Sequence, residues 1–145
     1  MNAMEISRTG LDVEWRRMEI IAQNIANMNT SRTASGDPFT PLRLVSGPDR
    51  TFAESLVEAR REQVEMQPAG VRVYGVERED GGVRRVYEPG HPHADPEGFV
   101  SYPDISHARE MTLMIETARA YEANLVAMSS ARQMYSSALQ LGRPA

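Results

Sequence analysis

The fold is decided by a stretch near the C-terminus, residues 111–139, which reads MTLMIETARAYEANLVAMSSARQMYSSAL. Its apolar residues recur along one helical stripe, and the seven-residue repeat holds for about four heptads. The stripe consists of Met111, Met114, Ala118, Tyr121, Leu125, Met128, Tyr135 and Leu139, with a break at Arg132. It predicts a long C-terminal helix with a coiled-coil-like seam. This helix should begin near Asp104–Ser106, where either residue can cap it, and stop before Gly142.

The N-terminal end carries a second amphipathic helix, over about residues 4–28. After Leu11 its apolar residues follow at steps of four and three, which is the period of an α-helix. The stripe consists of Met4, Leu11, Trp15, Met18, Ala22 and Ile25, with Ile21 and Met28 flanking it. Turn-forming side chains from Asn27 to Ser31 mark the end of this helix. The two ends of the chain are therefore expected to pair with each other and with other copies.

Between the helices lies a middle segment that Gly and Pro interrupt too often for a continuous helix. Residues 71–87 alternate, turn at residues 80–82 and alternate again, which predicts a β-hairpin. Residues 88–103 hold two Gly and four Pro and predict an ordered loop, while residues 51–66 leave helix and loop equally open. The predicted fold is mainly α with a small β-containing middle. Its parts are residues 1–32 and 105–145, the helices of a coiled-coil core, and residues 33–104, the irregular middle.

Composition limits the classes of function. The 145 residues suit one domain, and 41% are hydrophobic but only 6% aromatic, so a core would lack the large rings that bury most area. A net charge of −4 and a pI near 5.4 argue against a nucleic-acid partner. The absence of Cys excludes disulfides and thiolate metal sites. No stretch approaches the roughly 18 apolar residues of a membrane span, and the first residues do not read as a cleaved signal. We expect no direct membrane insertion.

Methionine occupies stripe positions where a tightly specified core would use Leu or Ile, and Met suits surfaces that meet non-identical partners. Amide side chains beside the stripes can bond between helices without the cost of buried ions. Core filling and ordinary solvated amides remain the alternatives for individual residues. The residues expected at an assembly interface are Leu11, Trp15, Met18, Asn24, Ile25 and Asn27 on the first helix, and Met114, Tyr121, Asn124, Leu125, Met128 and Tyr135 on the last.

A metal hydrolase is the sharpest rival interpretation. The spacing His91-x-His93-x-Asp95 is the opening of a His-x-His-x-Asp-His zinc motif. Pro96 stands where the next histidine belongs, and His107 is the only other histidine. No Gly-x-Ser-x-Gly elbow for a serine hydrolase occurs either. We therefore expect no catalytic residue, no metal and no cofactor.

Three blocks resemble a known family. Residues 21–33 (IAQNIANMNTSRT) resemble the N-terminal signature of bacterial flagellar rod and hook proteins, an axial protein family. Residues 90–103 (GHPHADPEGFVSYP) resemble a segment of its C-type proximal rod subunit, and residues 118–124 (ARAYEAN) resemble the C-terminal signature of that subunit. The resemblance is weak over residues 33–67. It also departs at residues 106–110, where the family tends toward Asn-Pro and an acidic pair.

The resemblance implies a structural role. Such subunits pass through the flagellar type III apparatus without a cleaved signal and assemble helically into the rod, which crosses the periplasm as a drive shaft. Their terminal helices pair in a coiled-coil layer. The implied partners are copies of the chain, other rod proteins and the junction with the membrane ring and export gate. A soluble helical adaptor or chaperone, or a different axial subunit, is the alternative.

Overall fold

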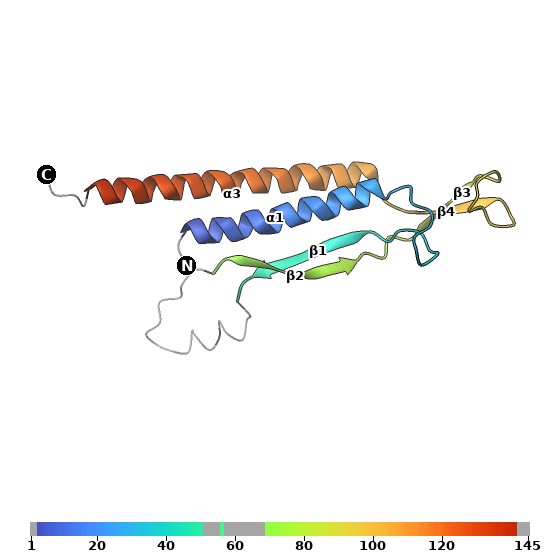
Figure 1. Ribbon diagram of the computed structural model, residues 1–145, viewed down its shortest axis with the longest axis horizontal. Coiled ribbons are helices and arrows are strands. Elements are labelled where there is room, and N and C mark those ends of the chain that lie inside the picture. The colour runs from blue at the N-terminus through green and yellow to red at the C-terminus, as the bar shows by residue number, and fades with distance from the viewer. Residues whose placement is uncertain (1–2, 51–55, 57–68, 142–145) are drawn as a thin grey trace. The chain divides into compact units, whose positions relative to one another are not determined.

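The computed structural model describes residues 3–50, 56 and 69–141 (Figure 1). The helix left open at residues 51–66 lies outside these residues except for Leu56. The elements in chain order are α1 (Ala3–Ala26), β1 (Leu42–Pro48), β2 (Val71–Arg78), β3 (Val83–Tyr87), β4 (Phe99–Pro103) and α3 (His107–Leu141). Two long terminal helices with a small β middle agree with the predicted fold class. Within the described residues, no helix has the length and apolar character to cross a membrane.

The end of α1 is fixed by the side chains that the sequence marked as turn formers. The Asn27 amide donates to the Gln23 carbonyl at 2.9 Å, and the Asn27 side-chain oxygen accepts the Thr30 hydroxyl at 3.1 Å. The Thr30 N–H donates to the Asn27 carbonyl at 2.9 Å. These bonds take up backbone groups that a continuing helix would use, so α1 ends at Ala26.

The start of α3 is capped by Ser106, as predicted. The Ser106 hydroxyl oxygen accepts the N–H of Arg109 at 3.4 Å, and its carbonyl accepts the N–H of Glu110 at 3.0 Å. A capping-box glutamate would stand at Arg109. The Arg109 guanidinium instead donates to Glu79 at 3.1 Å. The helix therefore starts with one cap and an ion pair to the middle of the chain.

The contacts divide the chain into two compact units. Unit 1 holds the described residues within Met1–Arg16, Val45–Gly75 and Thr117–Ala145, and unit 2 holds Arg17–Leu44 and Val76–Glu116. Each unit thus contains a part of α1, a part of α3 and a part of the β1–β2 pair. Each unit has its own packing between the two helices.

The β-strands pair differently from the prediction. Strands do form over residues 71–78 and 83–87, but they do not pair with each other: β2 pairs with β1, and β3 pairs with β4. The predicted hairpin at residues 71–87 is therefore wrong. After β2 the N–H of Glu79 donates to the Pro41 carbonyl at 2.8 Å, which continues the pairing with the β1 side instead of closing a turn onto β3.

The β3–β4 hairpin also replaces part of the predicted loop at residues 88–103. Its strands are antiparallel, with Val83 opposite Pro103 and Tyr87 opposite Phe99. Val100, opposite Val86, is fully buried, and the Tyr87 and Phe99 rings meet edge to face with centroids 5.3 Å apart. A buried apolar side chain and an aromatic pair thus favour this partner for β3.

Each unit has a small core. In unit 1 the α1 residues Ser7, Leu11 and Val13 are buried together with Thr117 of α3. The Thr9 hydroxyl oxygen accepts the N–H of Val71 at 3.1 Å and so ties α1 to the start of β2. In unit 2 two buried polar side chains lie among the buried apolar ones. The buried side chains of this unit include Ile21, Asn24, Leu44, Val100 and Glu110.

Candidate functional site

The C-terminal half of α3 carries much of the exposed apolar surface of the described chain. Leu125 is 46% exposed, and the residues that follow Arg132 are exposed on all sides. Along α3 the exposed large hydrophobic side chains are Met111, Ile115, Leu125, Val126, Met134, Tyr135, Leu139 and Leu141. Exposed apolar side chains gathered in this number on one helix are typical of an interaction site.

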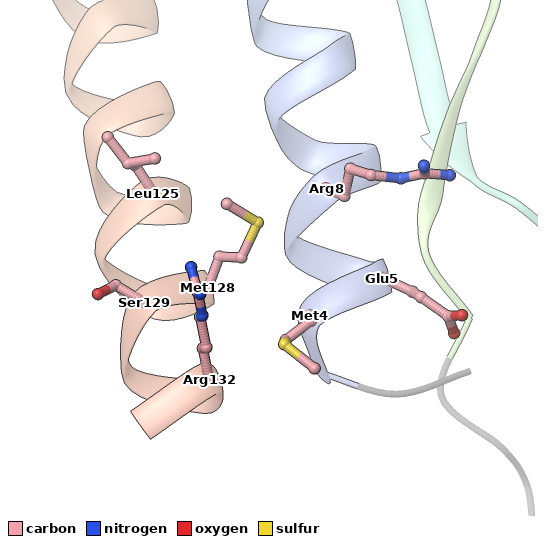
Figure 2. A pocket seen from close by; sticks show the side chains of 7 residues that line it. All are labelled: Met4, Glu5, Arg8, Leu125, Met128, Ser129 and Arg132. Atoms are coloured by element: carbon pink, nitrogen blue, oxygen red, sulfur yellow. The ribbon is translucent and has the colours of Figure 1, made fainter. Parts of the chain in front are cut away.

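In unit 1 a groove lies between the first turns of α1 and the C-terminal half of α3 (Figure 2). Its volume is about 650 Å³, and the residues that line it are Met4, Glu5, Arg8, Leu125, Met128, Ser129 and Arg132. Figure 2 shows Met4 and Met128 pointing into the gap from opposite helices, while Glu5 and Arg8 point away from α3. Two flexible methionine side chains thus line a groove that is open at the surface of unit 1.

Further along unit 1 the two helices approach closely. A Cβ atom on Gly10 of α1 would lie 2.6 Å from the Asn124 side-chain oxygen of α3. The Asn124 amide donates to the Ala120 carbonyl of its own helix at 3.0 Å. Beside this crossing the Trp15 and Tyr121 rings pack with centroids 6.3 Å apart. Asn124 and Tyr121, both predicted at an assembly interface, therefore make contacts within the chain.

Two of the buried positions of α3 lie one residue before positions of the predicted seam. Glu110 and Thr117 are buried where the heptad pattern named Met111 and Ala118. Met114, Tyr121 and Met128 belong to both sets and are half-buried. Hydrophobic periodicity missed the buried positions because their side chains are polar and pack through hydrogen bonds and small volume.

In unit 2 the side chain of Asn24 lies in the interior of the chain with no exposed surface. Its amide nitrogen donates to the Leu42 carbonyl at 2.9 Å and to the Glu110 carboxylate at 3.1 Å, and its oxygen accepts the Leu42 N–H at 2.9 Å. Both amide hydrogens and the amide oxygen of Asn24 are thus bonded to β1 and α3 of the same chain. The structure places Asn24 in the interior of its own chain, and its predicted role at an assembly interface stays a prediction.

Glu110 is the acidic member of this cluster and is only 2% exposed. Both of its oxygens accept bonds from the Arg43 guanidinium, one of them at 2.9 Å, and Arg43 also pairs with Glu79 at 2.6 Å. Burial alone would raise the pKa of the Glu110 carboxyl. The bonds from Arg43 and Asn24 and the Arg43 charge outweigh burial and hold this pKa below its ordinary value. The bond to Glu110 in turn raises the pKa of Arg43.

We call Asn24, Arg43 and Glu110 the polar cluster. The sequence interpretation did not name Arg43 or Glu110 as functional. The sequence held a signal for a buried charge, because Glu110, Thr117 and Asn124 follow one another at seven-residue spacing on the same face of the helix. A charged residue on a buried face requires a partner of opposite charge.

The loop between β3 and β4, residues 88–98, contains His91 and His93, belongs to unit 2 and has its own hydrogen bonds. The Asp95 carboxylate accepts the N–H groups of Phe99 at 2.8 Å and Glu97 at 3.0 Å and pairs with Arg85. The bond from Phe99 is the main cause that lowers the pKa of Asp95. His91 accepts the N–H of His93 at 3.1 Å. Among the described residues, no three His, Asp or Glu side chains form a group that could hold a metal ion.

Two family models match the ends of the chain. The model described as "Flagella basal body rod protein" matches residues 4–32, and "Flagellar basal body rod FlgEFG protein C-terminal" matches residues 97–141. The chain is also 31% identical to the flagellar basal-body rod protein FlgC of Borreliella burgdorferi, with 97% of this chain and 95% of that protein covered. The chain belongs to the FlgC family of flagellar basal-body rod proteins. FlgC of Aquifex aeolicus is 34% identical, with 92% and 90% covered.

FlgC of Salmonella typhimurium is 26% identical over 99% of this chain and 98% of that protein. These alignments cover nearly the whole chain, including residues 33–96, which neither family model matches. The family resemblance inferred from residues 21–33, 90–103 and 118–124 is thus confirmed. The FlgC relatives are named as rod proteins, and neither family description names a catalytic activity.

Proposed function

We propose that this chain is a structural subunit of the proximal rod of the flagellar basal body and assembles helically with copies of itself and with other rod proteins. In the assembled rod, which crosses the periplasm, it transmits torque as part of the drive shaft. Membership of the FlgC family supports this role. The structural observation that carries the proposal is the exposed apolar surface of α3.

This surface requires cover on more than one side. Successive residues of an α-helix point about 100° apart, so the neighbours Met134 and Tyr135 face different directions. Both are more than 60% exposed. Burial of one such side chain contributes about 1.5–3 kcal/mol. A helix end with apolar residues on several sides fits a position among several neighbours, as in a helical assembly, better than a single two-subunit contact.

The residues predicted for the interface contribute in different ways to this proposal. Trp15, Leu125 and Tyr135 are exposed and are the proposed direct contacts with neighbouring subunits. Leu11 is buried within unit 1, and Asn24 within unit 2. The remaining predicted residues are half-buried and are proposed to make contacts both within and between subunits: Met18, Ile25, Asn27, Met114, Tyr121, Asn124 and Met128.

The proposal includes a route to the rod. The chain passes in an unfolded state through the flagellar type III apparatus without a cleaved signal peptide, and it joins the rod near the membrane ring and export gate. The small cores support this route, because Leu11, Val13, Ile21, Leu44 and Val100 are the buried hydrophobic side chains of the described residues. A fold with so few of them is expected to unfold readily for export, and neighbouring subunits then supply the remaining apolar burial. The terminal helices are proposed to form the coiled-coil layer of the rod.

Complementation of a deletion strain tests the assembly surface. Leu125→Asp places a charge in the groove and is expected to abolish rod assembly while the chain is still exported. Ser130→Asp, on an exposed residue in the same half of α3, is the matched control and is expected to support motility. Swimming, basal bodies in electron micrographs and the exported chain on immunoblots are the readouts. Normal rods with Leu125→Asp would show that the groove is not an assembly contact.

A further inference from the structure

The polar cluster connects α1, β1 and α3 within unit 2 through side-chain hydrogen bonds. The Asn24 amide satisfies both backbone groups of Leu42 and one oxygen of Glu110. Arg43, which follows Leu42, binds the same carboxylate through two nitrogens. One side chain from each of α1, β1 and α3 therefore meets in a single hydrogen-bonded group. Every buried side-chain polar atom of the described residues has a partner.

A second contact between the helices has the same register. In unit 2 Asn24 meets Glu110, and in unit 1 Gly10 meets Asn124. Gly10 precedes Asn24 by two heptads, and Asn124 follows Glu110 by the same two heptads. The helices are antiparallel, so one alignment of α3 against α1 satisfies both contacts. Asn124 leaves no room for a Cβ atom at Gly10, so any other alignment would need another small residue of α1 opposite Asn124.

Apart from the close approach at Gly10, the half-buried positions of α3 carry no charge that would distinguish one alignment from another. The half-buried positions of α3 include Met114, Ala118, Ala120 and Met128. Methionine adapts to irregular gaps, and alanine offers little shape to recognise. A slip of α3 by one heptad toward its C-terminus would again place uncharged side chains at these positions, although three of them are larger: Tyr121, Leu125, Ala127 and Tyr135. It would also place Thr117, which has no charge, opposite Arg43 and Asn24 in place of Glu110.

We infer that Asn24, Arg43 and Glu110 are positioning residues that select the register of α3 against α1. A slipped register takes the buried carboxylate of Glu110 away from Arg43 and leaves it only its pair with the part-exposed Glu79. Loss of one partner of a buried pair is costly, whereas apolar replacement of the whole pair is often neutral for stability. A single polar group in a helix seam is known to fix register in this way. Through the register the cluster determines which residues of α3 are left exposed. The consequence for rod assembly rests on the function proposed above.

The test uses a variant that removes both charges but keeps a partner for Asn24. In Arg43→Met/Glu110→Gln the new side chains have similar length, and the glutamine oxygen can still accept from Asn24. Arg119→Met/Glu122→Gln makes the same chemical changes at exposed positions of α3 and is the matched control. Register is read by a disulfide between Gly10→Cys and Asn124→Cys, because the chain has no native cysteine.

This reporter has suitable geometry. A Cβ atom on Gly10 would lie 2.9 Å from the Asn124 Cγ atom, which stands near the place of the sulfur of a cysteine at position 124, so the two side chains are within reach of a disulfide. We expect most control chains to form the intramolecular disulfide in mild oxidant. In the Arg43→Met/Glu110→Gln background the yield should fall several-fold, while the helical circular dichroism and the thermal midpoint change little. Arg43→Lys, which keeps the charge, should restore part of the yield when paired with native Glu110.

Two results would overturn the inference. An unchanged disulfide yield would show that the register does not depend on the charges. A large fall in the thermal midpoint, with loss of the helical signal, would show that the cluster holds the fold together and does not select among folded alignments. Both readouts use the purified chain, so they are independent of the Leu125→Asp assembly test and of the proposed function.

Discussion

The amide of Asn24 donates a hydrogen bond to the carboxylate of Glu110, with 3.1 Å between the nitrogen and the oxygen, and both side chains are buried. The two residues are 86 positions apart in the chain. One lies in the stretch 4–32 and the other in the stretch 97–141, which the two family models match. The contact therefore joins the two most recognisable blocks of the sequence inside one subunit.

Removal of the Glu110 carboxylate is predicted to destabilise the chain strongly. Glu110→Ala leaves Arg43 and Asn24 with unpaired groups in a buried site, and loss of one partner of a buried pair costs about 3–5 kcal/mol. Urea unfolding followed by circular dichroism measures this loss. Glu116→Ala, at an exposed position of the same helix, is the control and should change the free energy of unfolding by less than about 0.5 kcal/mol. Equal effects of the two substitutions would contradict the buried pair.

Acid is predicted to weaken the fold through the same group. The folded-state pKa of Glu110 lies below its ordinary value of 4.5, so ionised Glu110 stabilises the chain above that pH, and this contribution is lost as the pH falls through the folded-state pKa. Asp95, whose pKa is also lowered, adds to the trend. The free energy of unfolding should therefore decrease between neutral pH and pH values below 4.5. Glu110→Gln should flatten this dependence, and an equally steep dependence in that variant would count against the assignment.

The contact of Gly10 with Asn124 predicts that Gly10→Ala destabilises the native chain but stabilises a variant that lacks the Asn124 side chain. Gly10→Ala improves helix propensity by about 1 kcal/mol, but its Cβ atom would press on the Asn124 side chain, and overpacking costs about 1–3 kcal/mol. In the native chain the substitution should therefore destabilise, by about 1 kcal/mol. In an Asn124→Ala background the obstruction is gone, and the same substitution should stabilise by a similar amount. Additive effects in this double-mutant cycle would rule out the close approach.

Trp15 provides a spectroscopic probe of assembly. It is the only tryptophan and is 55% exposed beside Tyr121. Burial of its indole by a neighbouring subunit should shift the emission to shorter wavelength as the purified chain associates at increasing concentration. The Leu125→Asp variant should remain at the emission of the isolated chain. Association of the native chain without any shift would remove Trp15 from the proposed interface.

The sequence predicted the helices well because their signals are local. The stripes of α1 and α3, the turn formers after Ala26 and the cap at Ser106 all act within a few residues. The strands at residues 71–78 and 83–87 were also predicted, since alternation is local too. Their partners were not, because each strand could pair with more than one neighbour along the chain, and the choice depends on burial such as that of Val100, which alternation does not encode.

The candidate site was predicted only in part for a related reason. Apolar periodicity identified Leu125 and Tyr135, which the chain leaves exposed. It passed over Glu110 and Arg43, because a charged residue reads as a solvated one until its partner is known. Asn24 was singled out, but its bonds are made within the subunit. Polar contacts between distant segments carry no periodic signal, so only the structure shows them.

The most direct test of the account is mass spectrometry of hook–basal bodies purified from the organism that encodes this chain, together with electron micrographs of a deletion strain. If the chain is a structural rod subunit, it is present in the purified particles and its deletion leaves membrane rings without a rod. Particles that lack the chain, together with complete rods in the deletion strain, would contradict its role as a structural rod subunit.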